Sequence, residues 1–134
     1  MRQTLAGVLL MATAVGHALV GVVLFRQPLT AILEEGAINT IQPPIYVAQP
    51  HFERIATFWF FIFSPVLFLL GQIANHAVER GDRETLRLVG WYLLGMGFIG
   101  GIMLPVSGQW SLIALAAFVF KAASATDQRS VRAA

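Results

Sequence analysis

The sequence predicts an all-α protein, a four-helix transmembrane bundle with a short interfacial helix in the outer loop between its first two spanning helices. Of its 134 residues, 57% are hydrophobic and only 12% are charged, whereas about a quarter of the residues of a soluble domain are charged. The mean hydropathy is +0.70. The charged residues lie near the chain ends and in two short clusters, with long uncharged runs between them. The length fits one domain.

Four apolar runs approach the length that a membrane-spanning helix requires, about 20 residues. They cover residues 5–25, 55–74, 86–104 and 107–120. The first run continues past its small residues to Phe25, which favours a spanning helix over a signal peptide. The fourth is short unless the preceding turn, "PVSGQW", lies at the membrane surface. We therefore expect a transmembrane domain over residues 1–121 and a frayed cytoplasmic tail over residues 122–134.

The positive charges predict the orientation, since Arg and Lys concentrate on the cytoplasmic side of membrane proteins. Seven of the nine lie before the first run, between the second and third or at the very start of the third, or after the fourth. Only Arg26 and Arg54 lie on the opposite side. Both termini are therefore expected in the cytoplasm. The pI of about 9.7 arises from these membrane-flanking residues, so the bilayer is the expected partner and nucleic acid is not.

The outer loop, residues 27–52, is too long for a tight hairpin. Its first part favours a helix that begins at Pro28, ends at Gly36 and carries Leu29 and Ile32 on one face. This helix would lie on the outer leaflet with Glu34 toward water. The proline-rich stretch over residues 41–50 is expected to be extended, either as a cap over the bundle or as a loosely ordered connector.

His17 is the one histidine within the predicted spans, and such groups tend to face the bundle interior or a water-filled cavity. It shares a helix face with Thr13 and Gly21, and the glycine permits a close helix approach. Two interpretations stay open. The imidazole lines an outward-opening ligand pocket, or it holds two helices together through a hydrogen bond.

Aromatic and polar residues near the same end extend the predicted pocket. Pro65 is expected to kink the second span and open a cavity. The predicted ligand contacts are His17, Phe58, Trp59, Ser107 and Trp110. The alternatives are an aromatic belt or the lipid-facing surface for Phe58 and Trp59, and a plain membrane-surface turn for Ser107 and Trp110.

Gly97 and Gly101 form a GxxxG pair in the third span, which is typical of close helix packing. The contact is either within the chain or between two copies in a homo-oligomer. At the inner face, Gln72, Asn75 and His76 are expected to cap the second span, followed by a solvated charged hairpin.

No sequence motif identifies an enzyme. The chain has no cysteine and no nucleotide-binding, zinc-protease or serine-hydrolase motif, so no metal or cofactor is expected. The catalytic candidates are His17 as general acid or base, with Glu34 or Glu35 reaching over it.

Three short motifs resemble a family of small bacterial four-helix integral membrane proteins that is catalogued as a domain of unknown function. They are Gly-His in the first span, Phe-Trp-Phe in the second and a Pro-x-Ser-Gly-x-Trp turn. The matching residues are Gly16, His17, Phe58, Trp59, Phe60, Pro105, Ser107, Gly108 and Trp110. The resemblance covers about residues 4–120 and implies a bacterial inner-membrane protein. It implies no activity.

Three functions remain for this chain. The leading one is a membrane protein that binds a lipophilic ligand or a partner helix in an outer pocket around His17. The alternative is a small membrane-embedded enzyme acting on a lipid-like substrate. The third is a subunit of a small exporter or channel. Coupled transport usually needs a buried ionisable group, and His17 is the one candidate within the predicted spans.

Overall fold

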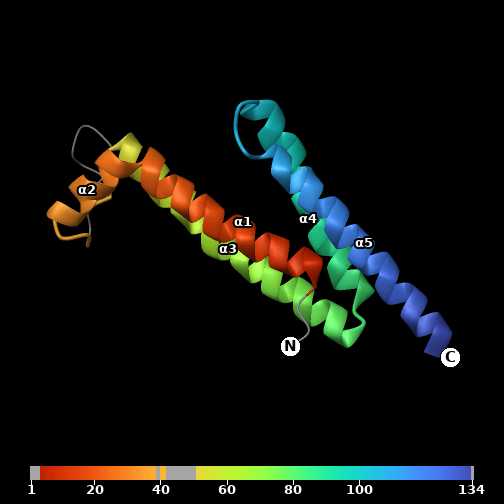
Figure 1. The fold of residues 1–134 in the computed structure, drawn as a ribbon. Coiled ribbons are helices and arrows are strands. Elements are labelled where there is room, and N and C mark those ends of the chain that lie inside the picture. The colour runs from red at the N-terminus through yellow and green to blue at the C-terminus, as the bar shows by residue number, and fades with distance from the viewer. Residues whose placement is uncertain (1–3, 39, 42–50, 134) are drawn as a thin grey trace. The chain divides into compact units, whose positions relative to one another are not determined.

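The computed structural model describes residues 4–38, 40–41 and 51–133 (Figure 1). Within them the chain forms five helices and no strand, so the all-α prediction is confirmed. The helices are α1 (Leu5–Leu24), α2 (Arg26–Glu34), α3 (Phe52–Arg80), α4 (Arg83–Met103) and α5 (Trp110–Ala133). Three of them, α1, α3 and α4, are long and apolar enough to cross a membrane. The apolar part of α5, Trp110–Thr126, is shorter.

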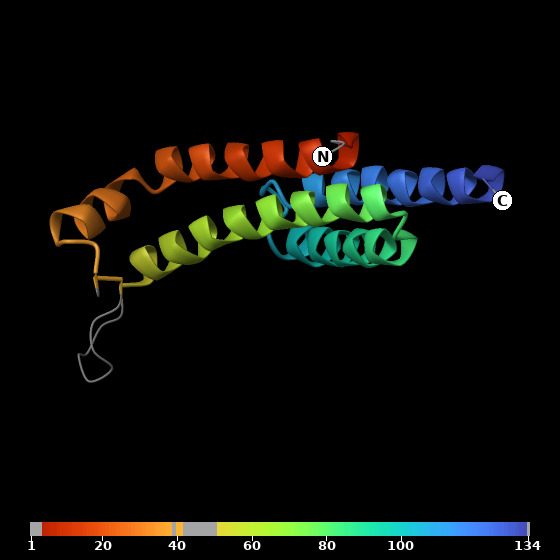
Figure 2. The same cartoon turned by 90° about the horizontal axis from the view of Figure 1, so that it is seen from below.

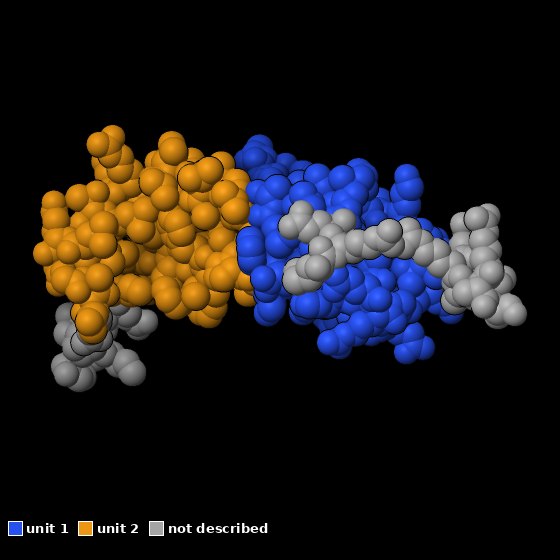
Figure 3. Space-filling view, turned by 60° about the horizontal axis from the view of Figure 1, so that its bottom comes forward, with its two compact units in different colours: residues 1–12, 68–134 blue, residues 13–67 orange. Residues whose placement is uncertain are grey.

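The chain divides into two compact units, coloured separately in Figure 3. One comprises Met1–Ala12 and Phe68–Ala134, and the other comprises Thr13–Leu67. Helices α1 and α3 contribute to both, so each unit contains its own stretch of contact between these two helices.

In the first unit, α1 and α3 approach closely because glycines face each other. A Cβ atom on Gly71 would lie 2.8 Å from the carbonyl oxygen of Gly7, and a Cβ atom on Gly7 would lie 2.2 Å from Oδ1 of Asn75. Asn75 is fully buried. Its Oδ1 atom accepts hydrogen bonds from the backbone N–H of Thr4 at 2.8 Å and from the Thr4 hydroxyl at 2.9 Å.

This contact corrects the predicted end of the second span. The prediction that Gln72, Asn75 and His76 cap the helix is wrong, because α3 continues to Arg80. Gly81, with φ +71°, ends it instead, since glycine adopts the left-handed conformation that ends many helices at little cost. Asp82 then caps α4 by accepting a hydrogen bond from the backbone N–H of Thr85.

Helix α4 packs along α5, and the two lie side by side in Figures 1 and 2. Small residues make this possible. A Cβ atom on Gly97 would lie 3.0 Å from the backbone nitrogen of Ile113, and one on Gly101 would lie 2.8 Å from the Trp110 ring. Of the two uses predicted for this glycine pair, the structure therefore contains the packing within the chain. A homo-oligomer stays a prediction.

Helix α5 differs from the predicted fourth span at both ends. It begins at Trp110, because residues 104–109 form the turn that follows α4. It continues to Ala133, so the segment that was predicted to be a frayed tail is helical. The prediction of a helix in the long loop is confirmed by α2. Gly36, with φ +95°, follows its end, and the backbone N–H of Ala37 returns to the carbonyl of Ile32.

Candidate functional site

His17 lies on α1 within the second unit and contacts α3 through three side chains. Its Nδ1 atom is 3.0 Å from the hydroxyl oxygen of Ser64. Its ring stacks on Phe60, with centroids 3.9 Å apart and planes inclined by 12°. Phe63 meets it edge-on at 5.5 Å. The imidazole is half-buried, whereas Ser64 is buried. The histidine therefore forms an interhelical hydrogen bond, as one of its two interpretations required.

Gly21 lies one turn along α1 from His17 and is buried. A Cβ atom there would lie 2.8 Å from the ring of Phe60 and 2.9 Å from that of Phe61. The predicted role of this glycine, to let another helix approach beside the imidazole, is confirmed. The same contact holds Phe60 in position to stack on His17.

Phe58 and Trp59, two predicted ligand contacts, lie on α3 and contact each other at 5.6 Å. Both are exposed, Phe58 by 39% and Trp59 by 65% of its surface. The ring contacts of His17 come instead from Phe60 and Phe63, which point to the α1 side of the helix. Whether the two exposed rings contact a ligand stays a prediction.

Ser107 and Trp110 belong to the other unit, where they stabilise the turn between α4 and α5. The Ser107 hydroxyl donates to the carbonyl of Leu104 at 2.6 Å. The Trp110 indole N–H donates to the carbonyl of Pro105 at 3.0 Å. Both polar groups thus have a local partner in the turn, and their predicted part in ligand binding stays a prediction.

Glu35, a catalytic candidate, is bound by an arginine. The Arg54 guanidinium donates to both of its carboxylate oxygens at 2.6 Å and to the carbonyl of Thr40 at 2.8 Å. The hydrogen bonds and charge of Arg54 lower the pKa of the Glu35 carboxyl below its ordinary value. Glu35 therefore links the end of α2 to the start of α3. Glu34 is exposed.

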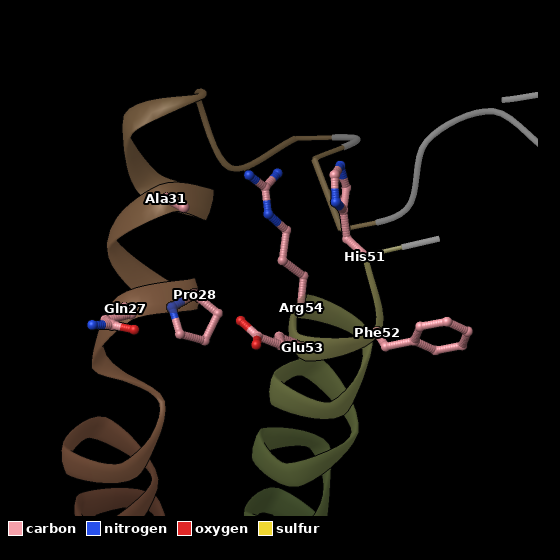
Figure 4. A pocket seen from close by; sticks show the side chains of 7 residues that line it. All are labelled: Gln27, Pro28, Ala31, His51, Phe52, Glu53 and Arg54. Atoms are coloured by element: carbon pink, nitrogen blue, oxygen red, sulfur yellow. The ribbon is translucent and has the colours of Figure 1, made fainter. Parts of the chain in front are cut away.

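A cavity of about 550 Å³ lies between α2 and the first turn of α3 (Figure 4). Glu53 points from α3 toward Pro28 on α2, while Phe52 points away from α2. None of the five predicted ligand contacts lines it. Its lining residues are Gln27, Pro28, Ala31, His51, Phe52, Glu53 and Arg54. Among the residues that the structure describes, no group of three His, Asp or Glu side chains is arranged to hold a metal ion.

Comparison with known proteins gives a family for the chain. The model described as "Family of unknown function (DUF6463)" matches residues 1–126. The chain belongs to this family. No curated protein and no solved structure matches it.

The predicted membership of a family of unknown function is thereby confirmed. The matched residues include His17 with its contacts Ser64, Phe60 and Phe63. They also include the cavity beside α2 and the contact between Thr4 and Asn75. The family description assigns no activity, so a function must be argued from these sites.

Ser64 and Phe63, which contact His17, are not among the predicted site residues, and the burial of Asn75 is not predicted either. The sequence does offer an indication for Ser64, because it is a hydroxyl residue in the middle of the apolar run over residues 55–74 and could pair with an intramembrane histidine. The sequence predicts Asn75 only as a helix cap. Its hydrogen-bond partner, Thr4, is 71 residues away.

Proposed function

We propose that this chain is an integral membrane protein that binds a lipophilic molecule beside His17. Four helices would cross the bilayer, with α5 as the fourth, both termini in the cytoplasm of a bacterial cell and α2 on the outer leaflet. The site would then lie in the outer half of the membrane.

The exposed apolar surface supports a place in the membrane. Only 22% of the apolar window of α1, and the same share of that of α3, is buried. Large side chains such as Leu19, Val23 and Phe98 are more than half exposed. A soluble protein rarely exposes continuous apolar surface of this extent, whereas lipid chains cover it without cost.

The observation that carries the ligand proposal is the unused nitrogen of His17. Nδ1 is bonded to Ser64, but among the residues that the structure describes no group bonds Nε2. The ring is half-buried, so this nitrogen is within reach of a molecule in the surrounding lipid. A polar nitrogen facing hydrocarbon without a partner costs free energy, and a ligand with a polar group would remove that cost.

A partner transmembrane helix is the second candidate, since a polar group on that helix would serve the same nitrogen. Catalysis has less support. The enzyme hypothesis needs Glu34 or Glu35 near His17, and Arg54 holds both carboxylate oxygens of Glu35.

Native mass spectrometry of the protein extracted from its own membrane tests the proposal, with His17→Ala as the comparison and the exposed Val15→Ala as the matched control on the same helix. We expect an adduct on the wild type and on the control that the His17 variant loses. An adduct with the mass of a protein would favour a partner helix. Equal adduct-free spectra for all three would contradict the proposal.

The four-span topology has a separate test. Reporter fusions at the C-terminus, after residue 40 and after Val106 should report cytoplasm, outside and outside, respectively. A C-terminal reporter on the outside would leave three spanning helices and contradict the part proposed for α5.

A further inference from the structure

The surroundings of Ser64 indicate which residue donates the hydrogen in the bond between His17 and Ser64. A serine or threonine hydroxyl within a helix commonly donates to the carbonyl four residues earlier. The hydroxyls of Thr30, Thr57, Ser124 and Thr126 all do so in this chain, at 2.7–3.1 Å. The buried hydroxyl of Ser64 has no such bond in the described chain, and its partner is Nδ1 of His17.

The direction of this bond follows from the supply of acceptors. A buried hydroxyl hydrogen without an acceptor is costly, and among the described residues His17 Nδ1 is the one acceptor that Ser64 has. If Nδ1 carried the proton, Ser64 would accept it and its own hydrogen would have no acceptor. Ser64 therefore donates, and Nδ1 of the neutral ring accepts.

The tautomer of the ring is then determined. A neutral imidazole has one N–H group, and the hydrogen bond made by one nitrogen decides which nitrogen carries it. With Nδ1 as the acceptor, Nε2 carries the hydrogen and is a donor. Nε2 is also the nitrogen without a partner among the described residues.

The surroundings hold this donor in a fixed direction. Phe60 covers one face of the ring at 3.9 Å, and Phe63 lies against its edge. Gly21 brings the Phe60 ring close to α1. These contacts restrict the rotation of the imidazole, so the donor is preorganised and a ligand does not bear the cost of ordering it.

We propose that His17 donates a hydrogen bond from Nε2 to a carbonyl oxygen of the lipophilic ligand. The inference rests on the ligand site proposed above and narrows it to acceptors. A carbonyl oxygen accepts without presenting a hydrogen of its own, so it complements an N–H group in hydrocarbon. An alkane has no such group, and an alcohol would bring a second hydrogen that needs its own acceptor.

Two sources supply a carbonyl in a membrane. One is the acyl ester of a surrounding phospholipid, and the other is a separate lipophilic carbonyl compound such as a quinone. The chemistry at Nε2 is the same for both, and the composition of the bilayer distinguishes them.

The tautomer is measured on the whole protein with ¹⁵N-labelled histidine in nanodiscs of ether-linked phospholipid, which has no carbonyl. The chain has three histidines, and His17→Gln identifies the signals of His17 by their loss. We expect a neutral ring with hydrogen on Nε2 and none on Nδ1. Hydrogen on Nδ1 would overturn the inference while leaving the native mass-spectrometric adduct, and thus the proposed function, unaffected.

The acceptor is tested by adding decylubiquinone to the same nanodiscs, with decylbenzene as the matched probe without oxygen. We expect the quinone alone to shift the Nε2 signal. His17→Phe, which keeps the aromatic stack and lacks the donor, should bind the quinone about tenfold more weakly. A shift already present in ester-linked lipid before any quinone is added would identify the lipid ester as the ligand.

Each remaining outcome decides between the two proposals. No shift with the quinone or in ester lipid, together with an adduct in native mass spectrometry, overturns the carbonyl class and retains a ligand site. A shift caused equally by decylbenzene overturns the hydrogen bond. No shift and no adduct contradicts the proposed function itself.

Discussion

The Oδ1 atom of Asn75 accepts hydrogen bonds from both donors of Thr4, from its backbone N–H at 2.8 Å and from its hydroxyl at 2.9 Å. The two residues join the start of α1 to the last turns of α3, and Asn75 is fully buried there. Gly7 leaves the space that the amide group occupies. A short polar contact therefore fixes the register of these two helices, because moving either helix by one turn would leave the buried amide without its partners.

Replacing Asn75 with Ala should lower the free energy of unfolding by about 2 kcal/mol, because two donors lose their acceptor and a small cavity remains. Gln72→Ala, an exposed polar residue one turn earlier on the same helix, is the matched control and should change little. The measurement is unfolding in detergent micelles. Equal stability of both variants would remove the role given to Asn75.

Gly71→Ala should destabilise the same contact by about 1–3 kcal/mol, the usual cost of overpacking. Its added methyl group would meet the backbone oxygen of Gly7 at 2.8 Å and the backbone nitrogen of Met11 at 3.1 Å, and backbone atoms cannot rotate away. Gly16→Ala has nothing within 4 Å and should be neutral or slightly stabilising, since alanine favours a helix. Thermal unfolding of the two variants side by side checks this difference.

Local signals made much of the fold predictable. Apolar runs located α1, α3 and α4. In the long loop, Gly36 follows the end of α2, whereas Pro28 lies in its first turn, because the helix begins at Arg26. These features depend on residues that are close to one another in the sequence, so a single sequence reveals them. One local feature argues against the predicted frayed tail, because residues 121–134 contain neither glycine nor proline. Helix α5 runs through most of them.

The sites were harder to predict, because their partners are distant in sequence. His17 was identified as the polar residue of its span, but Ser64 became its partner only through the pairing of α1 with α3. Phe60 rather than Trp59 stacks on it, since neighbouring residues on a helix point in different directions. Asn75 is predicted as a helix cap and Arg54 as a residue that flanks the membrane, because their partners, Thr4 and Glu35, are distant in sequence.

The ion pair of Glu35 with Arg54 should make the attachment of α2 depend on pH. Arg54 lowers the pKa of Glu35, so its stabilisation is present above the ordinary range of a glutamate and is lost as the pH falls through the lowered value. The chain has no cysteine, so spin labels on Thr30→Cys and Phe58→Cys report one distance.

We expect that distance distribution to broaden in acid and, at neutral pH, in Glu35→Gln. Glu34→Gln is the control, because Glu34 is the exposed neighbour and Arg54 does not bond it in the described structure. If the Glu35→Gln distribution stayed as narrow as that of the wild type, other contacts would have to hold α2.

The packing of α4 on α5 predicts a contrast between two glycines of the same helix. Gly101→Ala would meet the Trp110 ring at 2.8 Å and should lower stability by about 1–3 kcal/mol. Gly95 is exposed with nothing within 4 Å, so Gly95→Ala should not. Sedimentation in detergent shows in addition whether either variant changes the oligomeric state. A change confined to Gly101→Ala, without loss of monomer stability, would indicate that this glycine also serves a homo-oligomer.

A double-mutant cycle on His17 and Ser64 separates the structural part of the histidine from its proposed ligand. Hydrogen bonds between membrane helices contribute about 0.6 kcal/mol on average and at most about 1.7 kcal/mol, so His17→Ala and Ser64→Ala should couple within that range. The cycle is measured by unfolding in detergent without ligand. If the coupling accounts for the whole effect of His17→Ala in the native membrane too, the histidine serves only to join α1 to α3. The other outcome is that His17→Ala costs more stability in membrane-extracted protein than the coupling energy explains, and that the Ser64→Ala variant keeps this additional stability. A ligand on Nε2 then supplies it, because Ser64 bonds only Nδ1.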